Sequence, residues 1–177
     1  MGHKARPIEE FLAILRDAGI ERLIDVRTAP GSRKHPQFGK DALAGSLEAA
    51  GIAYVWRREL GGFRKPKPPG QSPHTALESP AFRGYADHMD TEEFEAGLQW
   101  LIGSGRDAPT AFMCAESLWW RCHRRMLSDA LVAHGCVVFH LLGPGRREPH
   151  RLHQAARIDG SRVVYDVAGP EQQSLPG

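Results

Sequence analysis

The sequence predicts an α/β protein, folded as a single three-layer domain with a mainly parallel sheet and helices on both faces. Three observations predict this class. Short apolar, β-prone runs alternate with segments of helical periodicity, most of the connections between them are short, and 177 residues suit one compact domain. We place the domain over residues 1–168 and expect residues 169–177, rich in Gly, Pro and Gln, to form a flexible tail.

The first part of the chain predicts a helix, a strand, a helix and a strand. Residues 7–18 carry apolar side chains on one helical face and end at a glycine. Residues 22–26 form a short apolar run, and residues 27–39 hold two prolines and two glycines that predict a loop. A second amphipathic helix is expected at residues 41–50 and a second strand at residues 52–56.

A proline-rich segment at residues 61–80 separates these elements from the rest, and its composition predicts a long loop such as a lid. A helix capped by Thr91 follows, because Thr91 precedes an acidic first turn and an apolar periodic stretch. The remaining expected elements are a strand, a helix and two strands, at residues 110–114, 117–134, 136–142 and 162–165.

Composition excludes several classes of protein. The longest apolar run, residues 130–142, falls short of the ~20 residues that span a bilayer, so we expect no membrane role. Three cysteines without a signal peptide favour free thiols and a cytoplasmic location. No P-loop, GxGxxG, GxSxG or HExxH motif occurs, which excludes Walker-type nucleotide hydrolysis and gives dehydrogenase chemistry no support.

The candidate active site lies where the predicted strands end, because parallel α/β sheets bind ligands beyond the carboxyl ends of their strands. Asp25 and Arg27 follow the first strand, and Cys114 and Glu116 follow the strand at residues 110–114, so we expect the two pairs to face each other in one crevice. We predict Glu116, Cys114 and Asp25 as catalytic residues. The two carboxylates are candidates for proton transfer, and the thiol lies where a helix amino terminus lowers a cysteine pKa. Burial of Cys114 and simple capping by Glu116 are the alternatives.

Substrate contacts are expected from several segments. The loop after the first strand offers cations for an anion, with an ion pair that only ties the loop as the alternative. Gly61 and Gly62 mark a close approach of backbone, and Tyr85 suits stacking on a base. The full predicted set is Arg27, Ser32, Arg33, Gly61, Gly62, Tyr85, His123 and Arg124.

Zinc binding by Cys114, Cys122 and His123 is the alternative use of the cysteines. Adjacent positions diverge on a helix, and Cys122 shares the apolar face of the expected helix with Trp119 and Met126. No CxxC or HxxxH pair supplies a fourth ligand. We therefore predict no metal ligands and leave the cofactor open.

The chain also resembles the family called domain of unknown function 488 along almost its whole length. The resemblance is carried by LIDVRTAPGSRKHPQF, GIAYVWRRELGG, FRGYADHM, FMCAES, CHRR and GCVVFHL. It implies further site residues beyond the predicted set, namely His3, Gly84, Ala115 and Cys122, and it also includes His123. The family usually opens with a short strand before the Gly2-His3 pair, and here the sequence begins at Met1. The alternatives are a start that is truncated before this strand and an edge strand that is dispensable.

A looser similarity connects LIDVR and the later cysteine-helix-strand unit with rhodanese-like sulfurtransferases. In that family a loop cysteine forms a persulfide beside an arginine. This chain lacks the glycine of that loop and places Glu116 beside the thiol.

We therefore expect an enzyme or ligand-processing domain, either hydrolase or transferase, that acts on a phosphate-bearing nucleotide, nucleobase or nucleic-acid substrate. Thiol or persulfide chemistry at Cys114 is the first alternative. A non-catalytic nucleic-acid-binding module that uses the basic clusters is the second, although the formal net charge is only +2. The expected partner is a small molecule or a nucleic acid.

Overall fold

A three-stranded parallel sheet forms the centre of the computed structural model, which describes residues 1–3, 5–31 and 34–167. Its strand order is β2-β1-β3, with β1 at Arg22–Asp25, β2 at Ala53–Trp56 and β3 at Thr110–Met113. Asp25 lies opposite Trp56 on one side and opposite Met113 on the other, so all three strands end at the same edge.

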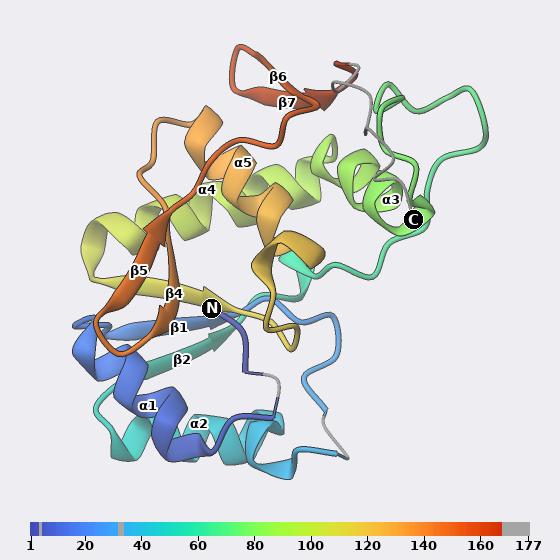
Figure 1. Ribbon diagram of the computed structural model, residues 1–177. Helices are drawn as coiled ribbons and strands as arrows, with labels where there is room; N and C mark the ends of the chain where they lie inside the picture. The colour runs from blue at the N-terminus through green and yellow to red at the C-terminus, as the bar shows by residue number, and fades with distance from the viewer. Residues whose placement is uncertain (4, 32–33, 168–177) are drawn as a thin grey trace, which may run out of the picture.

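Helices cover both faces of this sheet (Figure 1). α1 (Ile8–Asp17) and α2 (Lys40–Ala49) lie on one face. The other face is covered by α4 (Glu92–Asp107) and α5 (Arg124–Ala133), with α3 (Pro80–Met89) beside them. The predicted α/β class, with helices on both faces of a parallel sheet, is confirmed.

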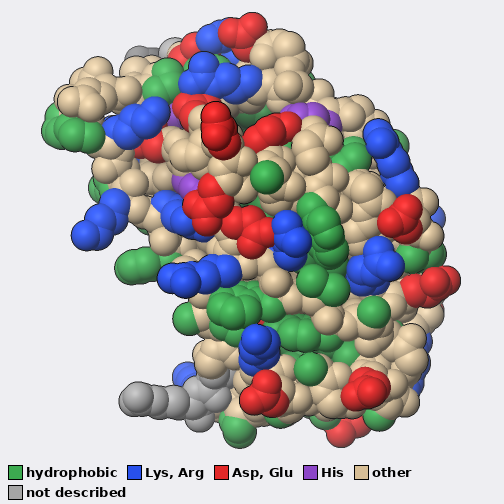
Figure 2. All heavy atoms as spheres, turned by 180° about the vertical axis from the view of Figure 1, so that it is seen from behind, with side chains coloured by type: hydrophobic (Ala, Val, Ile, Leu, Met, Phe, Trp, Pro, Cys, Tyr) green, Lys and Arg blue, Asp and Glu red, His purple; other side chains and the backbone are tan. Residues whose placement is uncertain are grey.

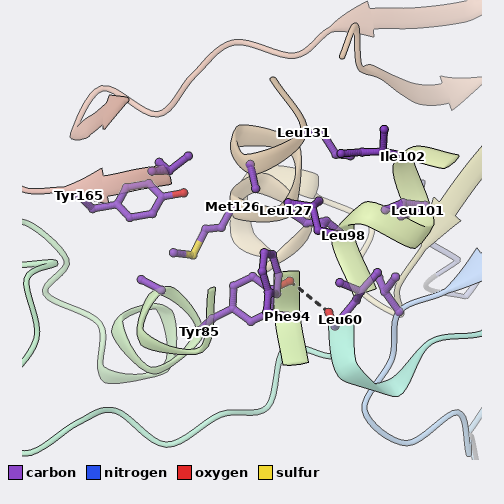
Figure 3. Packing of buried hydrophobic residues seen from close by; sticks show 14 of the residues in the cluster. Leu60, Tyr85, Phe94, Leu98, Leu101, Ile102, Met126, Leu127, Leu131 and Tyr165 are labelled. Atoms are coloured by element: carbon purple, nitrogen blue, oxygen red, sulfur yellow. Dashed lines mark hydrogen bonds between the residues drawn. The ribbon is translucent and has the colours of Figure 1, made fainter. Parts of the chain in front are cut away.

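Each layer of helices has its own hydrophobic core. The α1–α2 core contains Phe11, Leu15 and Leu43 together with Leu23 and Met113 from the sheet. The α3–α5 core packs aromatic and aliphatic side chains of the three helices against the other face; Figure 3 labels Leu60, Tyr85, Phe94, Leu98, Leu101, Ile102, Met126, Leu127, Leu131 and Tyr165. The two cores exist because successive strand residues point to opposite faces of a sheet.

Two antiparallel hairpins complete the fold. β4 (Phe139–Gly143) pairs with β5 (Arg146–Pro149), and β6 (Ala156–Asp159) pairs with β7 (Arg162–Tyr165). The strands expected at residues 136–142 and 162–165 therefore exist but do not join the parallel sheet. The turns are local: Gly145 and Gly160 adopt positive φ of 63° and 64°, a conformation that glycine adopts without strain and that suits tight hairpin turns.

The helix expected at residues 117–134 is wrong at its beginning. The chain forms a short 3-10 turn at Trp119–Arg121 (η3), Cys122 is extended with φ −129° and ψ 152°, and α5 begins only at Arg124. Tertiary contacts hold this arrangement. An added Cβ on Gly2 would lie 1.9 Å from the carbonyl oxygen of Glu116, so the N-terminal segment crosses closely over the loop.

The proline-rich loop is packed against α3 and β7. The backbone N–H of Lys67 donates to Asp87 at 2.8 Å, and that of Ala76 donates to the Tyr165 carbonyl at 3.0 Å. An added Cβ on Gly84 would lie 2.6 Å from the carbonyl oxygen of Arg64. Gly84, which the family resemblance marks as a site residue, lets this loop lie directly on the helix.

Candidate functional site

Three sulfur and nitrogen donors meet beyond the carboxyl end of β3. The Sγ atoms of Cys114 and Cys122 and a ring nitrogen of His123 all lie within 4.8 Å of one another. We call this group the Cys-Cys-His cluster. Cys114 follows β3 directly and is half-buried, whereas Cys122 and His123 precede α5 and are buried.

Because α5 begins after His123, the argument that Cys122 and His123 diverge on a helix does not apply. The extended backbone of Cys122 turns both side chains toward Cys114. The Nδ1 atom of His123 is 3.5 Å from Sγ of Cys122 and 4.0 Å from Sγ of Cys114.

A backbone carbonyl fixes the orientation of His123. Its Nε2 lies 3.1 Å from the carbonyl oxygen of Val26, just beyond β1. A carbonyl oxygen only accepts hydrogen bonds, so Nε2 carries the proton. In the neutral ring Nδ1 then keeps its lone pair, which faces the two sulfurs.

The His123 ring is also held by packing. An added Cβ on Gly62 would lie 2.3 Å from Nδ1, and the ring of Tyr85 has its centroid 5.0 Å from that of His123. The expectation that the glycine pair marks a close approach of backbone is confirmed, since Gly62 lies against His123 and Gly61 against Thr28. Tyr85 is fully buried, and its hydroxyl donates to the Leu60 carbonyl at 3.1 Å (Figure 3). Its ring therefore belongs to the α3–α5 core and supports His123 from inside the protein.

Arg124 connects the cluster to the loop that carries Glu116. Arg124 is 1 % exposed, its Nε donates to Sγ of Cys122 at 3.4 Å, and another guanidinium nitrogen donates to the Glu116 carbonyl. The Glu116 side chain is exposed and accepts from the backbone N–H of Leu118 at 3.1 Å. A buried positive charge therefore lies beside the sulfurs, and a carboxylate lies at the surface near them.

The surroundings of the two thiols differ in their effect on ionisation. The hydrogen bond from Cys114, together with His123 and the positive charge of Arg124, lowers the pKa of Cys122 despite its burial. The same contact with Cys122 and burial raise the pKa of Cys114. The first negative charge of the pair therefore falls on Cys122.

Asp25 and Arg27 lie on the other face of the sheet. Asp25 is in register with Met113, whose side chain belongs to the α1–α2 core, whereas Cys114 packs against the α3–α5 core. The expectation that this pair faces Cys114 and Glu116 is wrong, because side chains alternate along a strand and Cys114 is one position beyond the register partner.

The donors of Arg27 are used within the protein. Its Nε contacts both carboxylate oxygens of Asp25 at 2.9 and 3.1 Å, and it donates to the Phe38 carbonyl at 2.8 Å. The Tyr54 hydroxyl donates to Asp25 at 2.7 Å. This arrangement matches the alternative of an ion pair that ties the loop.

Of the other predicted residues, the structure describes His3 and Ala115. Ser32 and Arg33 lie outside the described residues. The His3 ring stacks on Phe38 at a centroid distance of 4.1 Å, and its backbone N–H donates to the Cys114 carbonyl at 3.2 Å. Ala115 is exposed in the loop between Cys114 and Glu116.

Sequence reasoning missed two features of the site. The Val26 carbonyl gives no signal in a sequence, because any residue supplies a carbonyl. Phe63, which follows Gly62 in the sequence, is 86 % exposed. Trp120, two positions before Cys122, is 46 % exposed. Single exposed apolar side chains are common on protein surfaces, so these two are of interest only because of their positions beside Gly62 and Cys122.

The fold and site together define a parallel α/β protein with a Cys-Cys-His cluster at the carboxyl ends of its strands. The family model of the domain of unknown function DUF488 matches residues 7–131, and the chain belongs to this family. No curated protein and no solved structure matches the chain. Among the described residues, no helix is both long enough and apolar enough to cross a membrane.

Proposed function

We propose that the protein is a ligand-processing enzyme whose chemical centre is the Cys-Cys-His cluster, acting on a substrate that carries a phosphate, such as a nucleotide or a nucleic-acid end. The observation that carries this proposal is the turn of His123 Nδ1 toward two sulfurs, fixed by the Val26 carbonyl. Such convergence of a base and two thiols at strand carboxyl ends supports catalysis over a structural role.

The surroundings of the cluster support an anionic, aromatic substrate. Arg124 brings a buried positive charge next to the sulfurs. The exposed rings of Phe63 and Trp120 offer surfaces on which a nucleobase can stack, an interaction worth about 1–3 kcal/mol per base. Glu116, exposed two positions after Cys114, is the candidate proton acceptor.

The charge distribution favours a small substrate over a long polyanion. On the face seen in Figure 2, Lys and Arg side chains alternate with Asp and Glu side chains. In the basic segment after β2, Arg57 pairs with Glu59, and Arg64 donates to the Gly61 carbonyl at 3.1 Å. These contacts support an enzyme over a nucleic-acid-binding module.

The test is turnover of a panel of phosphate esters: nitrophenyl phosphate, nucleoside mono- and triphosphates, and a 5′-phosphorylated oligonucleotide. We expect at least one to turn over, and we expect Cys122→Ser and Glu116→Gln each to lower kcat/KM by at least about tenfold, while Cys136→Ser does not. Cys136 lies outside the cluster, which makes it a matched control. Full activity in all three variants would contradict the proposal.

Thiol chemistry at Cys114 is the second candidate, favoured by its half-buried sulfur 4.0 Å from Nδ1 of His123. Because contact with Cys122 and burial raise the pKa of Cys114, this candidate requires His123 to take up the thiol proton. It then predicts that iodoacetamide at neutral pH modifies Cys114 faster than Cys136, which is also half-buried. Mass mapping of modified peptides measures both rates. Equal rates at the two cysteines would remove this candidate.

A further inference from the structure

We infer that the Cys-Cys-His cluster is a three-ligand zinc site with an open fourth position, held by Cys114, Cys122 and His123. The inference rests on the proposed function only for the ligand that enters the fourth position. The binding of the ion stands on the geometry of the three donors.

The distances between the donor atoms fit one ion. With bonds of about 2.3 Å to sulfur and about 2.0 Å to nitrogen, a tetrahedral zinc ion places a sulfur and a nitrogen about 3.5 Å apart, and two sulfurs about 3.8 Å apart. Cys122 Sγ already lies 3.5 Å from His123 Nδ1, and Cys114 Sγ lies 4.0 Å from the same nitrogen. Only a small movement of the Cys114 side chain, at the open side of the cluster, is needed to close the site.

The groups around the donors are those that metal sites use to orient their ligands. A ligating histidine usually donates its other N–H to a carbonyl or carboxylate, and His123 donates Nε2–H to Val26 at 3.1 Å. Arg124 Nε donates to Sγ of Cys122 at 3.4 Å, a contact that a bound thiolate accepts. Gly62 removes the Cβ that would displace the His123 ring.

The chemistry of the donor set selects zinc over harder cations. Two thiolates and one imidazole suit a borderline-soft ion, whereas calcium and magnesium require oxygen ligands. Two cysteines and one histidine with a fourth position open are a ligand set of catalytic zinc sites. The half-buried Cys114 leaves this fourth position on the solvent side.

Charge selects the fourth ligand. Two thiolates and a neutral imidazole balance the charge of Zn²⁺, and Arg124 adds a positive charge that is 1 % exposed. An anionic oxygen at the fourth position offsets this charge. The site therefore favours a phosphate oxygen of the proposed substrate over a neutral ligand.

The experiment uses the full chain, reduced and freed of metal by a chelator, and titrates it with Co²⁺ and Zn²⁺. We expect one ion per chain by elemental analysis and a thiolate-to-cobalt absorption band. Cys122→Ser and Cys114→Ser should each weaken binding by at least about tenfold and reduce the band, while Cys136→Ser should leave both unchanged. A cobalt spectrum without a thiolate band, or an equal loss in Cys136→Ser, would overturn the inference.

Two further measurements separate binding from folding and from function. In the wild-type protein, zinc should protect Cys114 and Cys122, but not Cys136, from iodoacetamide; equal labelling of the first two with and without zinc would contradict the site. Inorganic phosphate should then change the cobalt spectrum, and an unchanged spectrum would overturn the assignment of the fourth ligand. Metal binding is measured without turnover. A result that contradicts the zinc site or the proposed enzyme function therefore still allows the other to be tested.

Discussion

At the scale of single residues, the site depends on where one imidazole ring lies. His123 is held between the Val26 carbonyl, the backbone at Gly62 and the ring of Tyr85. The Val26 carbonyl accepts from Nε2 and the Tyr85 hydroxyl donates to the Leu60 carbonyl, so neither contact uses Nδ1. The ring is therefore positioned to present one nitrogen to the sulfurs of the cluster.

Gly62→Ala tests this positioning. The new methyl group would lie 2.3 Å from Nδ1 of His123, so we expect the ring to move, cobalt affinity to fall at least about tenfold, and the free energy of unfolding to fall by roughly 1–3 kcal/mol. Absorption titration and urea unfolding measure the two effects. Gly103→Ala in α4 is the control, because an added methyl there meets nothing within 4 Å; an equal effect of the two variants would contradict the expected role of Gly62.

Asp25 is a second residue whose role, catalytic or stabilising, can be tested by substitution. Asp25→Asn leaves Arg27 buried without a charged partner, and we expect the free energy of unfolding to fall by roughly 3–5 kcal/mol. Tyr54→Phe removes only one hydrogen bond to Asp25 and should cost about 1 kcal/mol. If Asp25→Asn lost turnover at unchanged stability, the carboxylate would have the catalytic role expected from the sequence.

At the scale of elements, local signals predict helices well and non-local contacts decide the site. Thr91 caps α4 as expected, accepting from the backbone N–H of Phe94 at 3.2 Å, because residues three positions apart supply the whole signal. The start of α5 is different. The close approach of Gly2 to Glu116 and the bond from Arg124 to the Glu116 carbonyl hold the chain out of a helix at Cys122.

The orientation of strand residues was equally beyond reach of the sequence. The carboxyl ends of β1 and β3 were predicted to meet, and they do. Which side chains share a face depends on the register between strands, which is a property of the pair. The sequence therefore places Cys114 and Asp25 at the correct edge of the sheet but does not reveal that they lie on opposite faces.

The junction of α3 with β7 provides a prediction on pH. Burial alone raises the pKa of Asp90, but hydrogen bonds from His74 and Arg162 more than offset it and lower the pKa to about 2. Because the pKa of Asp90 is lower in the folded protein than its unfolded value near 3.8, the ionised carboxylate stabilises the fold at pH values above 3.8. This contribution is lost as the pH falls toward 2. We therefore expect Asp90→Asn to be less stable than wild type at pH 7, with the difference shrinking between about pH 4 and pH 2.

Urea unfolding of both proteins at several pH values measures this difference. Glu92→Gln, two positions away in the exposed first turn of α4, is a control that should show no comparable pH dependence. A stability difference for Asp90→Asn that stays constant down to pH 2 would contradict the assignment.

At the scale of the whole molecule, Asp129 of α5 connects the C-terminal segments to the α/β core. It is fully buried and accepts from His150 at 2.8 Å, from the backbone of His153 at 3.1 Å and from the Tyr165 hydroxyl at 2.8 Å. Three segments beyond the parallel sheet therefore depend on one carboxylate.

Asp129→Asn removes part of this accepting capacity, and each buried donor left without an acceptor costs roughly 1–3 kcal/mol. We expect the free energy of unfolding to fall by at least about 2 kcal/mol. Asp166→Asn, which loses only a surface ion pair with Arg157, should destabilise the fold far less than Asp129→Asn. Thermal unfolding of the two variants measures both, and equal destabilisation would argue against the central role of Asp129.

The distance along the chain between His123 and its carbonyl partner has a practical consequence. The three donors are close in sequence, but the His123 ring is hydrogen-bonded to a carbonyl 97 positions away, so it is oriented toward the sulfurs only in the folded protein. Any ion or substrate that binds the oriented cluster more tightly than the unfolded chain stabilises the native state. By mass action it raises the melting temperature with the logarithm of its concentration relative to its Kd. Libraries of metals and phosphorylated metabolites can accordingly be ranked by the rise in Tm they produce, before any reaction is known.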